Sequence, residues 1–195
     1  MTKTAAPMTS GSIWKQMTFF AMPIFLGNLF QQLYNTVDSL IVGNFLGSSA
    51  LAAVSSSGSL IFMLIGFLSG ISAGAGVIVA RFFGAGDEKN LQRAVHTTVA
   101  FGLVAGVLMT GVGVALSPQI LRWMDTPESV MRESVTYLQI YFAGSLGFVM
   151  YNVLVGILQA VGDSRHPLYY LIVSSVINLV LDLLFITGFH TGVGG

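Results

Sequence analysis

The chain has 195 residues, of which 54% are hydrophobic and only 8% are charged, whereas a soluble domain carries about a quarter charged residues. This composition excludes a water-soluble globule and indicates a membrane protein. Eight basic residues balance eight acidic ones and cysteine is absent, which excludes a basic surface for nucleic acid, disulfides and cysteine nucleophiles.

Uncharged stretches predict an all-α membrane protein with a bundle of five transmembrane helices. The expected helices span residues 17–42, 52–80, 94–117, 134–159 and 167–189, and residues 1–16 form a polar segment before them. The break between the first two helices rests on turn-forming residues at Gly43, Asn44 and positions 47–49. The alternation of a membrane barrel strand is absent, so the spans are helices.

Local signals predict where helices begin and pack. Asp87 is expected to cap a helix, and Thr126, Pro127 and Glu128 are expected to act as N-cap, first-turn proline and first-turn acid. Glycines at spacing four predict close helix packing in two groups, Gly66 with Gly70 and Gly74, and Gly102 with Gly106.

The distribution of Lys and Arg predicts the orientation in the membrane. With a cytoplasmic N-terminus, the inner segments hold Lys3, Lys15, Arg81, Lys89, Arg93 and Arg165, and the outer segments hold only Arg122 and Arg132. We therefore expect a multi-pass protein of the cell inner or plasma membrane with residues 1–16 in the cytoplasm. Five spans place the C-terminus outside, and we expect the chain to be a fragment.

Two carboxylates fall within predicted spans without a basic partner at their depth, Asp38 and Asp182. A charge there costs about 2.5–3.5 kcal/mol on insertion scales. Such a carboxylate must bind a cation or take up a proton, which predicts an ion-coupled site. Asn178 lies one turn before Asp182, and a polar stripe precedes Asp38 on one helix face, formed by Asn28, Gln31 and Asn35, with Tyr34 beside it.

Other polar residues in the spans leave alternatives open. Gln31, Gln32, Asn35 and Asn152 suit either a binding cavity or interhelical hydrogen bonds. Tyr34 and Tyr137, taken alone, suit packing, and Pro23 either bends its helix or lies in a tolerated first turn. The run Gly84–Asp87 matches the G-x-G-D of intramembrane aspartyl proteases, but the charged residues after it place it in water. The three histidines are too scattered for a metal site.

Several motifs together resemble one family, the multidrug and toxic compound extrusion (MATE) transporters. They are Pro23; Asn28, Gln31, Tyr34 and Asp38 with Val42-Gly43; Gly84–Asp87; Leu158–Asp163 with Pro167; and Ile177–Ile186 with its Asn178 and Asp182. The resemblance covers residue 13 to the end, and it is specific through the order and spacing of these motifs.

This resemblance implies the N-terminal six-helix lobe of a two-lobed transporter, without its sixth helix and without the C-terminal lobe. The implied function is a secondary active antiporter, not an enzyme, that exports small organic, often cationic, compounds in exchange for H+ or Na+, with no cofactor and with membrane lipid around it. It implies cation binding, including possible Na+, at Asp38, Asn178 and Asp182. It also implies cavity-lining roles for Tyr34, Asn35, Tyr137 and Asn152, and a hinge at Pro23.

We expect Asp38 and Asp182 to form a coupled pair, because two carboxylates that share a site resist double ionisation. A flippase for lipid-linked oligosaccharides is an alternative of related architecture, but it would need basic residues for the phosphates. An intramembrane aspartyl protease is an alternative of another class. A non-functional fragment is a third, since one lobe has no opposing lobe against which to alternate.

Overall fold

The computed structural model describes residues 12–185, and within this range the side chains at positions 38, 42, 45–56 and 182–183 lie outside the described part. All regular elements of the described residues are helices, which confirms the all-α prediction. They are α1 (Ile13–Gly84), α2 (Glu88–Trp123), α3 (Glu128–Ala143), α4 (Ser145–Ala160) and α5 (Arg165–Leu183).

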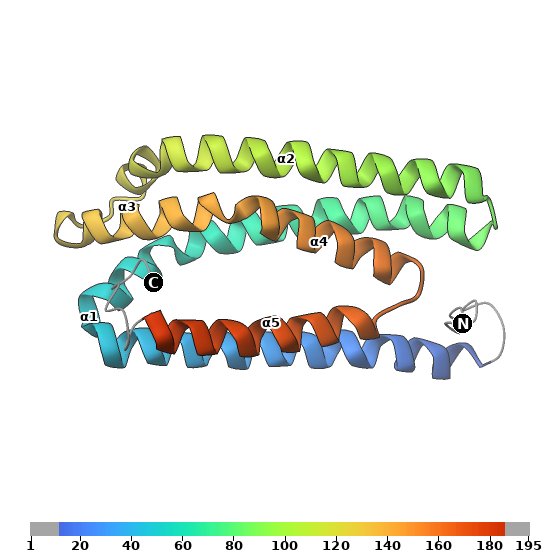
Figure 1. Cartoon of the computed structure of the whole chain (residues 1–195), viewed down its shortest axis with the longest axis horizontal. Helices are drawn as coiled ribbons and strands as arrows, with labels where there is room; N and C mark the ends of the chain where they lie inside the picture. Colours follow the sequence, from blue (N-terminus) through green and yellow to red (C-terminus); the bar gives the residue numbers. More distant parts are fainter. Residues whose placement is uncertain (1–11, 186–195) are drawn as a thin grey trace.

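Helix α1 has 72 residues and doubles back on itself, so that it forms two arms (Figure 1). Its first arm lies beside α5, where Gly27 faces Leu168 and Leu171. Its second arm packs against the other helices, with Leu60 and Leu64 on the cluster around Leu121, Leu138 and Phe142. The prediction of a loop between residues 42 and 52 is therefore wrong, because these residues are helical. The helix continues and bends there, because backbone groups in lipid must stay paired and Gly and Ser permit sharp bends.

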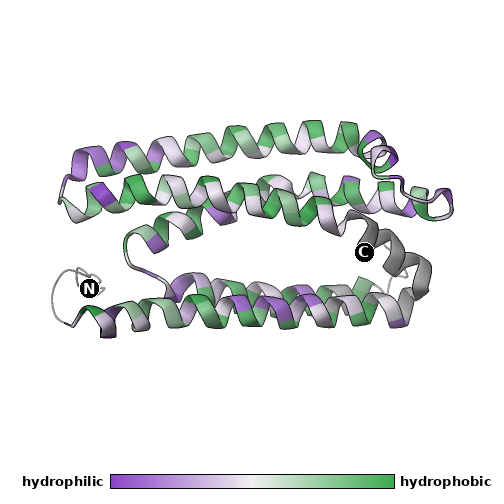
Figure 2. Ribbon diagram, turned by 180° about the vertical axis from the view of Figure 1, so that it is seen from behind, coloured by the Kyte–Doolittle hydropathy of each residue, from purple (hydrophilic) through white to green (hydrophobic). Residues whose placement is uncertain are grey.

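Two described helical segments are long and apolar enough to cross a membrane, Ser57–Gly84 and Glu88–Trp123. Helices α3 and α4 together make a third candidate, bent by 47°. The first arm of α1 covers the expected span 17–42, and α5 begins at Arg165 rather than 167. The predicted end of this last span at residue 189 lies outside the described residues. Figure 2 shows hydrophobic residues along the helices and hydrophilic ones at their ends, and also hydrophilic residues midway along the pair of α1 and α5.

The predicted fourth helix is two helices, broken at Gly144. Helix α2 supports both sides of the break. Its Thr110 hydroxyl lies 3.0 Å from that of Ser145, and its Gly113 leaves room for Phe142, whose Cδ1 atom would lie 2.1 Å from a Cβ atom on Gly113. The bend is thus held by contacts with α2 that sequence periodicity does not reveal.

Glycine packing differs from the prediction in one of its two groups. Gly102 and Gly106 do allow close approach, because a Cβ atom would lie 2.9 Å from Val153 and 2.6 Å from Leu146. Gly66, Gly70 and Gly74 instead have no neighbour within 4 Å of an added Cβ among the described residues, so the packing prediction is wrong for them here.

Helix α2 continues through Pro118 to Trp123, beyond its predicted end at residue 117. A proline inside a helix leaves the carbonyl four residues earlier without its backbone donor, and here that carbonyl belongs to Val114. The side-chain amide of Gln139 in α3 donates to the Val114 oxygen over 3.4 Å. A neighbouring helix therefore supplies the donor that the proline removes.

The predicted caps have different outcomes. Asp87 caps α2, because its carboxylate accepts from the Asn90 backbone N–H at 3.1 Å and from the Asn90 side chain at 2.7 Å. Thr126 does not cap α3. Pro127 occupies the cap position of α3, and the Thr126 hydroxyl is buried without a hydrogen bond to the described residues.

Candidate functional site

A hydrogen bond between side chains joins the first arm of α1 to α5. The Tyr34 hydroxyl donates to the Asn178 side-chain oxygen. Seven residues before Tyr34, Gly27 faces Leu168 and Leu171, seven to ten residues before Asn178. The two helices therefore run parallel at the same level, as Figure 1 shows. Two of the predicted site residues, 144 positions apart in the sequence, meet here.

The two aspartates of the predicted spans follow this junction on the same two helices. Asp38 lies four residues after Tyr34 in α1, and Asp182 lies four residues after Asn178 in α5. In parallel helices one turn advances both chains by about 5.4 Å in the same direction. Positions 38 and 182 thus share one level of the helix pair, although their side chains lie outside the described part of the structure.

A small apolar pocket of about 160 Å³ lies between the same helices. Tyr34 and Ser175 are its polar lining residues, and the others are Phe30, Leu33, Val37, Val176 and Leu179. No charged side chain is among these described lining residues.

The polar stripe of α1 does not face α5 as a whole. Asn28, Gln31 and Asn35 are exposed, and the Asn35 amide donates to the Gln32 side chain at 3.4 Å within the same helix. Tyr34, beside this stripe, is the residue whose hydrogen bond to α5 the structure describes. The stripe thus borders the junction and is open on its other side among the described residues.

Asn152 lines a second, larger pocket of about 420 Å³ between the two arms of α1 and α4, here called the α1–α4 pocket. The structure does not place Asn152 beside Tyr34, which lines the smaller pocket. The lining residues are Phe20 from the first arm; Ser69, Ser72, Ala73, Gly76, Val77 and Ala80 from the second arm; and Asn152, Val155, Gly156, Gln159 and Ala160 from α4.

Sequence reasoning missed Ser69, Ser72 and Gln159 as cavity residues. The available signal was the spacing of small residues, Ser72 with Gly76 and Gly156 with Ala160. These let α1 and α4 approach so closely that a Cβ atom on Gly156 would lie 3.2 Å from the Ser72 carbonyl oxygen.

Tyr137 and Pro23 occupy different surroundings from the aspartates. Tyr137 is half-buried in α3 and lines neither of the two pockets described above. Pro23 lies inside the first arm of α1, which stays helical through it. Its ring removes the donor for the Phe19 carbonyl, next to Phe20, which lines the α1–α4 pocket.

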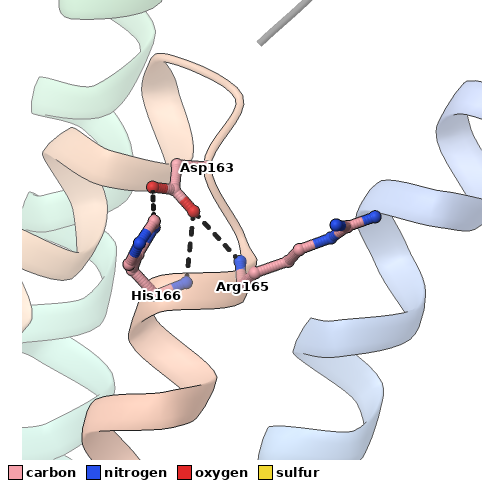
Figure 3. Close-up of polar contacts among 3 residues, drawn as sticks. All are labelled: Asp163, Arg165 and His166. Carbon is pink, nitrogen blue, oxygen red and sulfur yellow. Dashed lines mark hydrogen bonds and ion pairs between the residues drawn. The ribbon is translucent and has the colours of Figure 1, made fainter. Parts of the chain in front are cut away.

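A polar cluster closes the connection between α4 and α5 (Figure 3). The Asp163 carboxylate accepts from the backbone N–H groups of Arg165 and His166 at 3.2 and 3.1 Å and pairs with the His166 ring. Partial burial raises the pKa of Asp163, but the hydrogen bonds from His166 and Arg165 outweigh this effect and hold the pKa below its usual value. Asp163, one residue before the N-cap Ser164, therefore caps the first turn of α5, whereas Asp87 is itself the N-cap residue of α2.

The capping role of Asp87 counts against the intramembrane protease alternative. The Asp87 carboxylate accepts hydrogen bonds from Asn90 at the start of a helix, before the apolar span begins, where it serves as a cap. Among the described residues no three His, Asp or Glu side chains converge to hold a metal ion. The described helices fold back on one another and include long apolar spans, which is the architecture of a multi-pass membrane protein.

Comparisons with known proteins agree on one family. The MatE family model matches residues 23–184. "Probable multidrug resistance protein YoeA" of Bacillus subtilis is 38% identical over 177 residues, which cover 91% of this chain and 38% of the relative. "Probable multidrug resistance protein YpnP" of the same organism is 35% identical over 191 residues, which cover 98% and 43%.

A solved structure described as the outward-facing conformation of a multidrug resistance MATE family transporter is 27% identical. It matches with a TM-score of 0.88 over 98% of this chain and 43% of that chain. The chain belongs to the MatE family, and its fold is that of the N-terminal lobe of a MATE transporter. It spans about two fifths of the length of the curated relatives it matches.

Proposed function

We propose that this chain is the ion-coupling and substrate-binding lobe of a multidrug efflux antiporter. The observation that carries the proposal is the Tyr34–Asn178 hydrogen bond, which joins α1 to α5 one turn before Asp38 and Asp182. The relatives are named multidrug resistance proteins, and the family consists of transporters, which supports a role other than catalysis.

In this proposal Asp38 and Asp182 share one site with Asn178. Two carboxylates in a poorly solvated place repel each other and resist double ionisation. One proton or one Na+ relieves both the repulsion and the desolvation, and so couples ion binding to the arrangement of α1 against α5. The ion is a co-substrate that enters and leaves in each cycle.

Pro23 is the proposed hinge of the first arm. The proline lacks the donor that would hold the Phe19 carbonyl, so bending there breaks one hydrogen bond fewer than elsewhere in α1. Bending would move Phe20 at the α1–α4 pocket. Neutralisation of the aspartates and closure of the pocket would then be linked through one helix.

The cargo in this proposal is a small organic, often cationic, compound rather than a lipid-linked oligosaccharide. A phosphate-bearing cargo calls for basic side chains, and none is among the described residues that line the two pockets. The relatives' names likewise refer to drug export.

The test is replacement of each aspartate in the full-length transporter that contains this lobe. Asp38→Asn and Asp182→Asn should each abolish efflux of a fluorescent cationic dye while leaving the amount of protein in the membrane unchanged, because an amide cannot exchange a proton. Glu133→Gln, the same chemical change at an exposed position of α3, should transport normally. Unchanged efflux in the Asp38 or Asp182 variant would refute the proposed coupling site. Transport with and without Na+ at a fixed pH gradient separates the two ions.

A further inference from the structure

The α1–α4 pocket has a mostly apolar lining with a few polar side chains, and no charged side chain is among its described lining residues. Four lining side chains can form hydrogen bonds, Ser69 and Ser72 from α1 and Asn152 and Gln159 from α4. All four have an oxygen that accepts a hydrogen bond. The pocket therefore offers several neutral acceptors on two facing helices.

The two amide side chains that α4 contributes to the pocket, Asn152 and Gln159, differ in their hydrogen bonds. The Asn152 side-chain nitrogen donates to the Phe148 carbonyl of its own helix at 2.9 Å, which leaves the Asn152 oxygen as the group available to a ligand. Gln159 is half-buried, and the structure shows no hydrogen bond from its amide to another described residue. Its amide is therefore available to a bound molecule.

The spacing of the pocket walls is fixed by the close crossing of the two helices. A Cβ atom on Gly76 would lie 3.4 Å from the Gly156 carbonyl oxygen, and one on Gly156 would lie 3.2 Å from the Ser72 carbonyl oxygen. Backbone therefore packs on backbone beside the cavity. The acceptors are held on a rigid wall, which lowers the entropic cost of binding to them.

These features favour one chemical class of cation over another. A quaternary or fully alkylated ammonium has no N–H group, and it is recognised by a carboxylate or by a cage of several aromatic rings. Among the described lining residues Phe20 is the one aromatic side chain and there is no carboxylate. An amine that carries N–H groups can instead donate to the neutral oxygens.

We propose that the α1–α4 pocket selects organic cations whose amino groups carry N–H donors over analogues whose amino groups are fully alkylated, and that Gln159 is a specificity-determining residue. This inference rests on the proposed efflux function. It adds the chemical class of substrate, and it assigns the selection to a pocket other than the α1–α5 junction with its aspartates.

Two acridine dyes of the same ring system form a suitable probe pair. Proflavine carries two primary amino groups, and acridine orange carries dimethylamino groups in their place. Both cations carry an N–H on the protonated ring nitrogen, so they differ only in the N–H donors of the amino groups. The wild-type full-length transporter in everted vesicles should move proflavine faster than acridine orange. Gln159→Leu should reduce this preference about fivefold, the equivalent of one neutral hydrogen bond, chiefly through slower transport of proflavine.

Two further variants serve as controls. Gln119→Leu makes the same chemical change at an exposed position of α2 outside the pocket and should leave the preference intact. Ala73→Leu fills the pocket and should slow both dyes alike. Dye binding to the purified full-length protein, followed by fluorescence anisotropy, gives a second measure of the preference for any variant that does not transport.

Four results would overturn the inference. They are no preference in the wild type, an unchanged preference in Gln159→Leu, an equal loss of both dyes in that variant, and normal transport in Ala73→Leu. Failure of the proposed function is distinguishable: Asp38→Asn would then keep transporting both dyes with the wild-type preference. If the wild type transports neither dye, the proposed function fails for these dyes, and anisotropy of both dyes on wild type and Gln159→Leu still decides the preference.

Discussion

The α1–α2 and α4–α5 connections end in the same local structure, a glycine with positive φ followed by an aspartate that caps the next helix. Gly86 has φ +67° and Gly162 has φ +87°, a conformation that costs a residue with a Cβ atom about 1–2 kcal/mol. Asp87 and Asp163 then accept backbone N–H groups of the next helix. Each short Gly-Asp pair therefore reverses the chain and starts a helix at the membrane surface.

The cap at Asp163 makes a pH-dependent contribution to stability. Asp163→Ala should lower the free energy of unfolding by about 1 kcal/mol at neutral pH, the usual loss of a helix cap. Because the pKa of Asp163 is lowered in the folded protein, its stabilisation is complete above the unfolded pKa of about 3.9 and is lost as the pH falls through the folded pKa.

Thermal unfolding of the purified full-length protein in detergent, across a pH series, measures this difference. Wild type and Asp163→Ala should differ at neutral pH and converge in acid. Glu133→Ala, at an exposed position of α3, should show no such pattern. A difference that persists in acid would show that Asp163 acts through packing rather than through its charge.

At the scale of elements, polar side chains link neighbouring helices where the backbone is interrupted. Gln139 of α3 donates to the Val114 carbonyl of α2, which Pro118 leaves without its backbone donor. Thr110 and Ser145 meet beside the break at Gly144. In lipid, where water cannot pair such groups, these contacts allow α2 to carry a proline and α3–α4 to bend.

The close contact between Gly113 of α2 and Phe142 of α3 can be tested by adding a methyl group at Gly113. In Gly113→Ala the new Cβ atom would lie 2.1 Å from the Phe142 Cδ1 atom, so the ring must move, and we expect a loss of about 1–3 kcal/mol. The apparent melting temperature of the full-length protein in detergent reports the loss.

A matched control lies two residues away on the same helix. Gly111 has no neighbour within 4 Å of an added Cβ among the described residues, so Gly111→Ala should be neutral or stabilising, as alanine is in a helix. Adding Phe142→Ala should remove the penalty of Gly113→Ala, since the clashing ring is gone. Equal effects of the two glycine variants would contradict the tight contact.

At the scale of the whole molecule, the described basic residues are distributed unequally between the two ends of the bundle. The start of α1 and the α1–α2 and α4–α5 connections lie at one end in Figure 1. Lys15, Arg81, Lys89, Arg93 and Arg165 belong to these segments, whereas Arg122 and Arg132 belong to the α2–α3 end. The positive-inside rule therefore predicts that the α1–α2 connection is cytoplasmic.

Single cysteines can test this orientation, because the chain contains none of its own. Any cysteine elsewhere in the full-length protein would first be replaced by serine. In intact cells a membrane-impermeant maleimide should label Met124→Cys and should label Ala85→Cys only after permeabilisation; both positions are exposed. The reverse pattern would show that the N-terminus lies outside.

The sequence by itself determined the class, the family and most of the helical segments, because apolar runs, caps and isolated acids are local features of the chain. Through the resemblance it predicted Asn178 as a cation-binding residue and Tyr34 as a cavity-lining residue, and the structure joins these two side chains by a hydrogen bond. It did not predict the continuous bend of α1, the break at Gly144 or the open face at Gly66, since these depend on which helix lies opposite.

Only the tertiary structure decided that Asn152 belongs with Ser72 and Gln159 rather than with Tyr34. The hydrogen bond from Gln139 to the Val114 carbonyl likewise follows only from the tertiary structure. Helical periodicity specifies which residues share a face of one helix, whereas the partner of that face depends on close approach between residues far apart in the chain.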